Sequence, residues 1–156
     1  MATPAAIKEF FGSLQLASFE PLRAATRQAC KACGSSRKLY CYDCYRPVGL
    51  PEGSVPNVQL PINVEIVKHP MELQSKSTAI HARILSPHCV NIHTYPAMPV
   101  ITDASTTYLA FPSPDAVSVT EIDPAKLKSL IFVDSTWFQA KGIVRVSLSF
   151  LSFWHP

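Results

Sequence analysis

Four cysteines within fifteen residues are the side chains whose types and spacing most clearly predict chemistry in this sequence. They form two C-x2-C pairs, Cys30 with Cys33 and Cys41 with Cys44, and seven residues separate the pairs. This spacing lets each pair turn two thiolates inward, and a hairpin between the pairs brings all four within tetrahedral reach of one ion. Gly34, directly after the first pair, supplies the backbone freedom that such a turn needs. We therefore predict a structural Zn²⁺ site with Cys30, Cys33, Cys41 and Cys44 as its ligands.

Disulfide bonds are the alternative use of such a cysteine cluster. In small secreted domains, however, the cysteines spread along the chain and follow an export signal. Residues 1–16 contain the acidic Glu9 and only short apolar pieces, so no signal peptide is visible, and we expect residues 1–18 to be flexible. The fifth cysteine, Cys89, has no obvious partner in the sequence. Spacing and compartment together favour zinc.

Length and composition limit the remaining possibilities. The chain has 156 residues, 47% of them hydrophobic, which fits one domain or a small module joined to most of one. Fourteen prolines disfavour long helices before about residue 124. The formal net charge of +3 permits a nucleic-acid partner without arguing for one. No stretch approaches the ~18 apolar residues of a membrane span, so we expect a soluble intracellular chain.

The cysteine segment also carries positive charge and aromatic rings. Such a mixture can bind RNA, because cations pair with phosphates and aromatic rings stack on bases. The same composition can be the surface of a small module whose core is too small to bury its tyrosines, and the sequence leaves both interpretations open. The side chains concerned are Arg37, Lys38, Tyr40, Tyr42, Tyr45 and Arg46.

Four short segments have the pattern of β-strands. Residues 62–66 alternate apolar and polar side chains with a period of two, which is typical of a strand with one covered face. Residues 90–93 are another short strand candidate, residues 108–111 are a compact apolar run, and residues 131–133 have the pattern of a short buried strand. Because helical segments with short links lie between and after these strands, we predict an α/β sheet.

Helix signals are weaker than the strand signals. Residues 123–130 begin like a helix, with Asp123 as N-cap and a proline at the first helical position. Residues 138–141 start a helix that Gly142 can stop. Residues 19–29 have helical composition with Pro21 in the first turn, and residues 76–85 fit either a short helix or a strand.

Three polar motifs each begin where a predicted strand ends: HPME at 69–72, PSPDA at 112–116 and DSTW at 134–137. In open α/β sheets, ligands bind outside the carboxyl ends of the strands. If the three strands are parallel neighbours, the three motifs converge on one site.

Structural roles compete with this functional interpretation. An aspartate after a strand is more often a helix N-cap than a catalytic group, and Asp134 fits that description. Trp137, considered without its neighbours, is typical of a core residue. His69 and Glu72 lie close to a plausible helix start and can cap it. The set of His88, Cys89 and His93 has metal-binding side chains, but on a strand the three cannot face the same way.

The motifs occur in an order that resembles the DTW-domain family of tRNA-uridine aminocarboxypropyltransferases, in its mammalian-type form. The resemblance runs from Cys30 to Gly142. It comprises the cysteine pattern, then His69-Pro70-x-Glu72 with Ser77-Thr78-Ala79, then Phe111-Pro112-Ser113-x-Asp115-Ala116, then Asp134-x-Thr136-Trp137-x-Gln139-Ala140.

This resemblance implies a SPOUT-like α/β domain with a knotted cofactor region. It also implies transfer of the 3-amino-3-carboxypropyl group of S-adenosylmethionine (SAM) to N3 of a tRNA uridine, in the D-loop for this form. The expected partners are tRNA and SAM, and the expected location is the nucleus, with the cytosol as the alternative. Neither the resemblance nor the residues predict an oligomeric state.

The reaction assigns roles to four strand-end residues. Asp134 is suited to hold the SAM ammonium or to accept the N3 proton, and the sequence does not separate these roles. Trp137 offers a flat face to the adenine or the sulfonium. Thr136 and Ser113 can donate hydrogen bonds to a carboxylate or a ribose. We therefore predict Asp134 as catalytic and Ser113, Asp134, Thr136 and Trp137 as SAM-binding.

The chain departs from the family pattern after residue 143. We expect a helix and zinc-knuckle module at 19–47, the N-terminal part of a DTW domain at 57–143, and a non-family tail at 144–156 that forms one strand or stays exposed. A C-terminally truncated or alternative-terminus form of this kind would be an impaired transferase. The alternative is a non-catalytic fragment that binds RNA through its zinc module.

Overall fold

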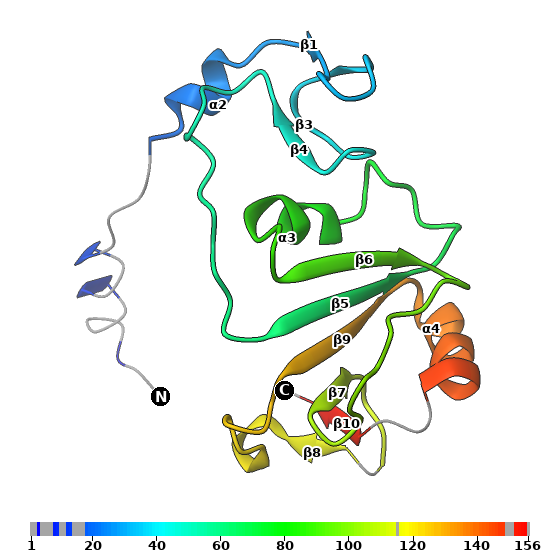
Figure 1. Ribbon diagram of the computed structural model, residues 1–156. Coiled ribbons are helices and arrows are strands. Elements are labelled where there is room, and N and C mark those ends of the chain that lie inside the picture. The colour runs from blue at the N-terminus through cyan, green and yellow to red at the C-terminus, as the bar shows by residue number, and fades with distance from the viewer. Residues whose placement is uncertain are drawn as a thin grey trace.

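The computed structural model describes residues 3, 8–9, 12–13, 18–114, 116–148 and 152–155, the last four by their backbone alone. Most of the expected N-terminal segment 1–18 lies outside these residues, as does Asp115 of the PSPDA motif. The described chain forms a small cysteine module, drawn in blue and cyan in Figure 1, and a larger unit built on one sheet. In this part of the chain, no helix combines the length and apolar character needed to cross a membrane.

The cysteine module consists of one short helix and two small hairpins. Helix α2 (Glu20–Ala24) has Pro21 in its first turn, as predicted, but it is shorter than the predicted segment 19–29. The second half of that segment is extended because Gln28 and Ala29 form strand β1, which needs an open backbone to pair. Strand β1 (Gln28–Ala29) pairs antiparallel with β2 (Ser36–Arg37), and β3 (Leu39–Cys41) pairs antiparallel with β4 (Arg46–Val48).

The larger unit contains a six-stranded sheet in the order β6-β5-β9-β7-β10-β8. Every strand pair in it is parallel, so the predicted α/β class is confirmed. The predicted strands are all present, and each strand end lies within two residues of its predicted position. The strands are β5 (Asn63–Lys68), β6 (Val90–Thr94), β7 (Thr107–Ala110), β8 (Val117–Ser118), β9 (Ser129–Asp134) and β10 (Ser152–His155).

Two helices cover opposite faces of this sheet. Neighbouring residues of a strand point to opposite faces, and Ile66 and Val67 of β5 belong to separate buried clusters. Ile66 lies in the cluster of α3 (Ala79–Leu85), and Val67 lies in the cluster of α4 (Trp137–Ile143). Figure 1 shows α3 over β6 and α4 at the end of β9. The segment 76–85, left open by the sequence, is therefore helical from Ala79.

The helix predicted at 123–130 is wrong. Asp123 accepts a hydrogen bond from the Ala125 amide at 3.0 Å, so it caps one turn rather than a helix. The amides of Lys128 and Ser129 then bind the Thr106 carbonyl, at 2.9 and 3.2 Å, which draws the chain into β9. Pairing with the neighbouring strand thus overrides the local helix signal of Asp123 and Pro124.

Gly142 does not stop α4, contrary to the prediction. The helix runs to Ile143 and continues as a π-helical turn, Val144–Leu148. Ile143, Val144 and Leu148 are buried against Val67 of the sheet, which favours continuation over termination. After this turn, β10 lies between β7 and β8. Of the two forms expected for the C-terminal segment, a strand or an exposed tail, residues 152–155 adopt the strand.

Candidate functional site

The three polar motifs converge at one edge of the sheet, as predicted. Strands β5, β9 and β7 are parallel neighbours, so the chain after each leaves at the same carboxyl edge. Lys68 and Asp134 are register partners at the ends of β5 and β9. The His69 amide donates to the Asp134 carbonyl at 3.0 Å and ties the first motif to the third. Sheet topology alone therefore assembles the candidate site.

Asp134 is the last residue of β9 and is not a helix N-cap. The N-cap of α4 is Thr136, which forms a capping box with Gln139. The Asp134 carboxylate instead accepts a hydrogen bond from the Ser77 hydroxyl, with 2.6 Å between Oγ and Oδ2. Among the described residues, no side chain or amide donates to its other oxygen, so one edge of the carboxylate is left for a ligand.

Trp137 is the first residue of α4, three positions after Asp134, and it is not a core residue. Its side chain is 65% exposed, and its ring lies 5.8 Å from that of Phe111 at the end of β7. Thr136 is exposed and Ser113 is half-buried, three residues beyond β7. The predicted SAM-binding residues thus all lie at or after the carboxyl ends of β7 and β9, at the same sheet edge.

Two residues of the candidate site, Lys68 and Ser77, were not predicted from the sequence. The Lys68 side chain is 2% exposed, and its ammonium donates to the carbonyls of His69 at 3.3 Å and Glu72 at 3.1 Å. It therefore fixes the HPME turn, in which His69 Nδ1 also accepts from the Met71 amide. A lysine that ends an alternating strand directly before a polar motif is the signal that could have revealed it.

The four cysteines predicted to bind a metal lie close together in the structure. The four Sγ atoms lie within 4.8 Å of one another, and none of the five cysteines forms a disulfide. Cys33 and Cys41 place their sulfurs 3.7 Å apart, close to the ~3.8 Å that tetrahedral coordination with metal–sulfur bonds of ~2.3 Å requires. The cluster can therefore hold a metal ion.

Two turns in the left-handed region shape the cysteine knuckles. Gly34 has a φ of 73°, and its amide donates to the Cys30 carbonyl at 2.8 Å, which confirms the role expected for this glycine. Tyr45, directly after the second pair, has a φ of 53° without being glycine. Such a conformation is unfavourable for a bulky residue, so the surrounding cluster must stabilise it.

The pKa values of the cysteine thiols shift in different directions. Hydrogen bonds from Ser35 lower the pKa of the Cys33 thiol to about 6, and backbone groups of Ala32 and Cys33 lower the pKa of Cys30. Hydrogen bonding to Cys33 and burial raise the pKa of Cys44 to about 12. Four crowded sulfurs cannot all ionise unless a cation neutralises them, which is the task of a bound metal.

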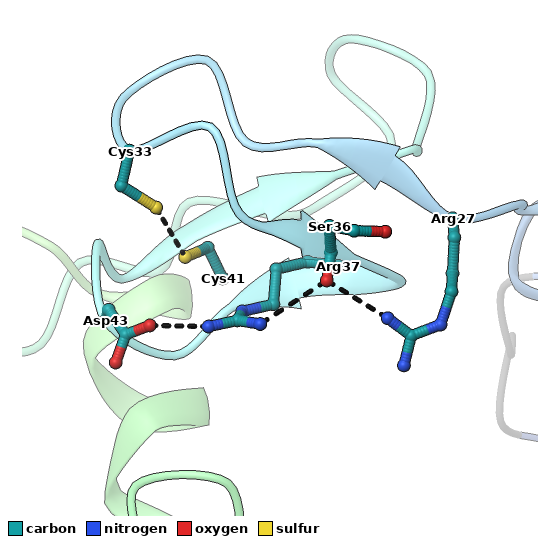
Figure 2. A network of polar contacts seen from close by, with 6 residues as sticks. All are labelled: Arg27, Cys33, Ser36, Arg37, Cys41 and Asp43. Carbon is teal, nitrogen blue, oxygen red and sulfur yellow. Dashed lines mark hydrogen bonds and ion pairs between the residues drawn. The ribbon is translucent and has the colours of Figure 1, made fainter.

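Arg37 lies next to the four-cysteine cluster, and Figure 2 shows it between Asp43 and the Ser36 carbonyl. Its guanidinium pairs with Asp43 at 2.7 Å and lies 4.1 Å above the Tyr42 ring. The carboxylate of Asp43 raises the pKa of this guanidinium, which stays charged. Because Tyr42 and Asp43 stand between the cysteines of the second pair, Arg37 holds that knuckle in place.

The group of His88, Cys89 and His93 is not a metal site. His93 pairs with Glu65, and Cys89 approaches Gln59 and the Leu60 carbonyl. Within the described part of the chain, the four cysteines are the only set of side chains gathered closely enough to hold a metal.

Fold and sites together define a class: an α/β protein with a parallel sheet, a candidate carboxylate site at the strand ends and an N-terminal module with a four-cysteine cluster that can hold a metal. The model of the DTW domain matches residues 38–153, and the chain belongs to this family. The matched range begins inside the cysteine module and ends within strand β10. The boundaries expected at 47, 57 and 143 stay a prediction.

Several relatives are named tRNA-uridine aminocarboxypropyltransferase 1. The Mus musculus protein is 45% identical over 115 residues, which cover 70% of this chain and 38% of the relative. The Xenopus tropicalis protein is 34% identical over 178 residues, covering 85% and 60%, and the Homo sapiens protein is 36% identical, covering 84% and 59%. No solved structure matches the chain.

The chain spans between about two fifths and three fifths of the length of these relatives. The alignment with the frog protein, at 178 positions, is longer than the whole chain of 156 residues. The relatives therefore also carry residues inside the matched region that this chain lacks.

Proposed function

We propose that this chain carries the acceptor and donor site of a SAM-dependent tRNA-uridine aminocarboxypropyltransferase, acting at N3 of a D-loop uridine. The observation that carries the proposal is the placement of Asp134 at the carboxyl edge of a parallel sheet, with one carboxylate oxygen lacking a donor among the described residues. The exposed Trp137 begins the helix that follows at the same edge. The relatives are named as aminocarboxypropyltransferases that act on tRNA uridine, and these names support the proposed reaction class.

SAM supplies a sulfonium whose aminocarboxypropyl carbon is open to in-line attack. In the proposed reaction, N3 of the uridine forms the new C–N bond while the C–S bond breaks and its electron pair neutralises the sulfur. The N3 proton must leave, and the open oxygen of Asp134 either accepts it or holds the SAM ammonium. Ser77 keeps that carboxylate in one orientation through its short hydrogen bond.

The neighbouring side chains would orient the donor. Trp137 presents an aromatic face to adenine or to the sulfonium, as a ring suited to cation–π contact. The Ser113 hydroxyl, at the same edge, can donate to a ribose or a carboxylate. The Thr136 hydroxyl donates to Gln139 Oε1 at 2.9 Å and is therefore left to accept a hydrogen bond from the donor. This arrangement would favour the aminocarboxypropyl carbon over the methyl as the point of attack.

Two structural proposals accompany the reaction. We propose that Cys30, Cys33, Cys41 and Cys44 hold Zn²⁺, because a four-sulfur set with this spacing is the usual ligand set of structural zinc. The parallel sheet is consistent with a SPOUT-like domain, whose knotted region stays part of the proposal. The expected location of the protein is the nucleus.

Mass spectrometry of digested tRNA tests the reaction. The zinc-loaded chain is incubated with SAM and unmodified tRNA, with the full-length human relative as positive control. We expect aminocarboxypropyl-uridine at a lower turnover than that of the relative, and none from Asp134→Asn. No product from this chain under conditions where the relative works would contradict transfer and favour the RNA-binding alternative.

A further inference from the structure

A groove on the cysteine module is lined by cationic and aromatic side chains. It encloses about 170 Å³ and lies between strand β3 and the loop before α3. This volume is below the ~300–1,000 Å³ of pockets that take whole small-molecule ligands, so it suits one planar group. We call it the module groove and define it by Arg27, Arg37, Lys38, Tyr40, Tyr42 and Ser75.

The charge of the module groove is positive. Residues 27–46 contain five arginines and lysines against one acidic residue, Asp43. Asp43 is already paired with Arg37, and Arg27 donates to the Ser36 carbonyl at 3.0 Å from the other side (Figure 2). Even beside the double negative charge of a zinc–tetrathiolate center, the segment keeps a positive excess. Arg27 and Lys38 are exposed and carry this charge into solvent.

The aromatic rings of the module groove are held in fixed orientations. Tyr42 is half-buried beneath the Arg37 guanidinium, and Tyr40 meets the His81 ring edge-to-face at 4.9 Å. A ring that is already immobilised loses little side-chain entropy when a flat partner stacks on it. Cations around fixed aromatic rings are the combination that holds single-stranded nucleic acid.

The module groove is also connected to the candidate active site. Ser75, on its rim, is two residues before Ser77, whose hydroxyl holds Asp134. His81, which packs on Tyr40, belongs to α3, the helix that follows the same loop. A molecule in the groove therefore contacts the loop that positions the carboxylate.

We propose that the module groove docks a single-stranded segment of RNA, with phosphates on Arg27 and Lys38 and one base on the tyrosine rings. A polyanion with planar bases matches both the charge and the aromatic faces. The proposal rests on the proposed function insofar as a tRNA supplies the strand. It deepens that function by assigning tRNA docking to the cysteine module, beside the loop of the reacting carboxylate.

The test is RNA binding without SAM, measured by fluorescence anisotropy on the zinc-loaded full chain. The probes are unmodified tRNA and a single-stranded uridine oligonucleotide, titrated over a range of salt. For Arg27→Gln with Lys38→Gln we expect about tenfold weaker binding at low salt and a salt slope lower by about 1.4. The control pair Lys126→Gln with Lys128→Gln, at the far edge of the sheet, should bind as the native chain does.

Variants of Tyr42 test the stacking. Tyr42→Phe keeps the ring and should bind normally, whereas Tyr42→Leu should weaken RNA binding about tenfold. Zinc content and melting temperature confirm that each variant is folded, and Tyr42→Phe remains informative if Tyr42→Leu fails to fold. Poly-glutamate serves as a competitor that has charge but no bases.

Native affinity in the Arg27 and Lys38 double variant overturns the proposal. So does competition by poly-glutamate as strong as that by RNA of equal charge, which would indicate an acidic protein partner. Because binding is measured without SAM, the two proposals fail separately. Lost product with intact binding contradicts only the transfer, and retained product with unaltered binding in the double variant contradicts only the groove.

Discussion

Among the residues that the structure describes, the carboxylate of Asp134 is held from one side only. The Ser77 hydroxyl fixes one oxygen at 2.6 Å, and the backbone at this position is tied to the His69 amide. A carboxylate that binds an ammonium or accepts a proton needs a fixed direction and an open lone pair. The sheet edge supplies both.

Ser77→Ala should separate this orienting role from simple stability. Loss of a hydrogen bond to a charged acceptor costs about 1.5–3 kcal/mol, so we expect both lower stability and about tenfold slower transfer. Ser86→Ala is a matched control, because Ser86 is also buried and donates one bond, to the Val58 carbonyl at 2.7 Å. The control should lose stability in chemical denaturation and keep its transfer rate. Equal rates in both variants would contradict an orienting role for Ser77.

Lys68 should be required for order in the HPME turn. Lys68→Met keeps the length of the side chain but leaves the carbonyls of His69 and Glu72 without their donor. We expect a loss of about 1–3 kcal/mol in the free energy of unfolding and faster amide exchange at residues 69–72. Lys128→Met, outside this turn, should change neither quantity. An unchanged exchange rate in Lys68→Met would show that the turn is ordered by other contacts.

At the scale of elements, the sequence predicted strands better than helices. The alternation at 62–66 and the short apolar runs reflect burial on a sheet, and each became a strand. The predictions at 19–29 and 123–130 relied on local helix signals, which pairing of Gln28 and Ser129 with other segments overrides. The convergence of the motifs was predictable because parallel strands share an edge. The contributions of Lys68 and Ser77 were not, because their partners are set by the fold.

Gly142 and Gly49 should respond in opposite directions to alanine. Gly142 lies inside α4 with open space around its Cβ position, so Gly142→Ala should stabilise the protein by about 0.5–1 kcal/mol. Gly49 has a φ of 69°, and an added Cβ would lie 2.6 Å from the Thr26 carbonyl oxygen. Gly49→Ala should therefore be destabilising by more than about 1 kcal/mol. Thermal melting of both variants measures this, and a destabilised Gly142→Ala would mean that the glycine is needed where α4 enters its π-turn.

The cysteine module should lose its structure when the proposed Zn²⁺ is removed from it. Its buried cluster consists of Cys30, Cys41 and Val48, which is too small a core to offset the entropy of ordering the chain. Chelation should therefore abolish the Tyr40 contact with His81 and release the module, while the sheet, with its own core, melts separately. Calorimetry with and without chelator shows whether one transition disappears. A single unchanged transition would mean that the module folds without metal.

At the scale of the whole molecule, strand β10 completes the sheet from the end of the chain. It lies between β7 and β8, with Ser152 in register with Tyr108 and His155 in register with Ser118. Without it, the backbone of β7 loses its partner on one side, and β8 loses the strand that joins it to the sheet. An unpaired edge of this kind exposes hydrogen-bonding groups and promotes association between chains.

Deletion of residues 149–156 should therefore damage the fold more than its length suggests. We expect a lower melting temperature, because the backbone pairing of β10 is lost, and concentration-dependent association in light scattering, because the free side of β7 can pair with another chain. Since β7 adjoins β9, this damage would lie beside the candidate site. Substituting Val146, which is 70% exposed, by Ser is a control for changes near the same end, and it should leave both measurements unaltered. A deletion variant that stays monomeric and melts as the native chain does would show that β7 needs no partner there. In that case the sheet up to β7 is the stable unit, and β8 and β10 are additions that the carboxyl-edge site does not require.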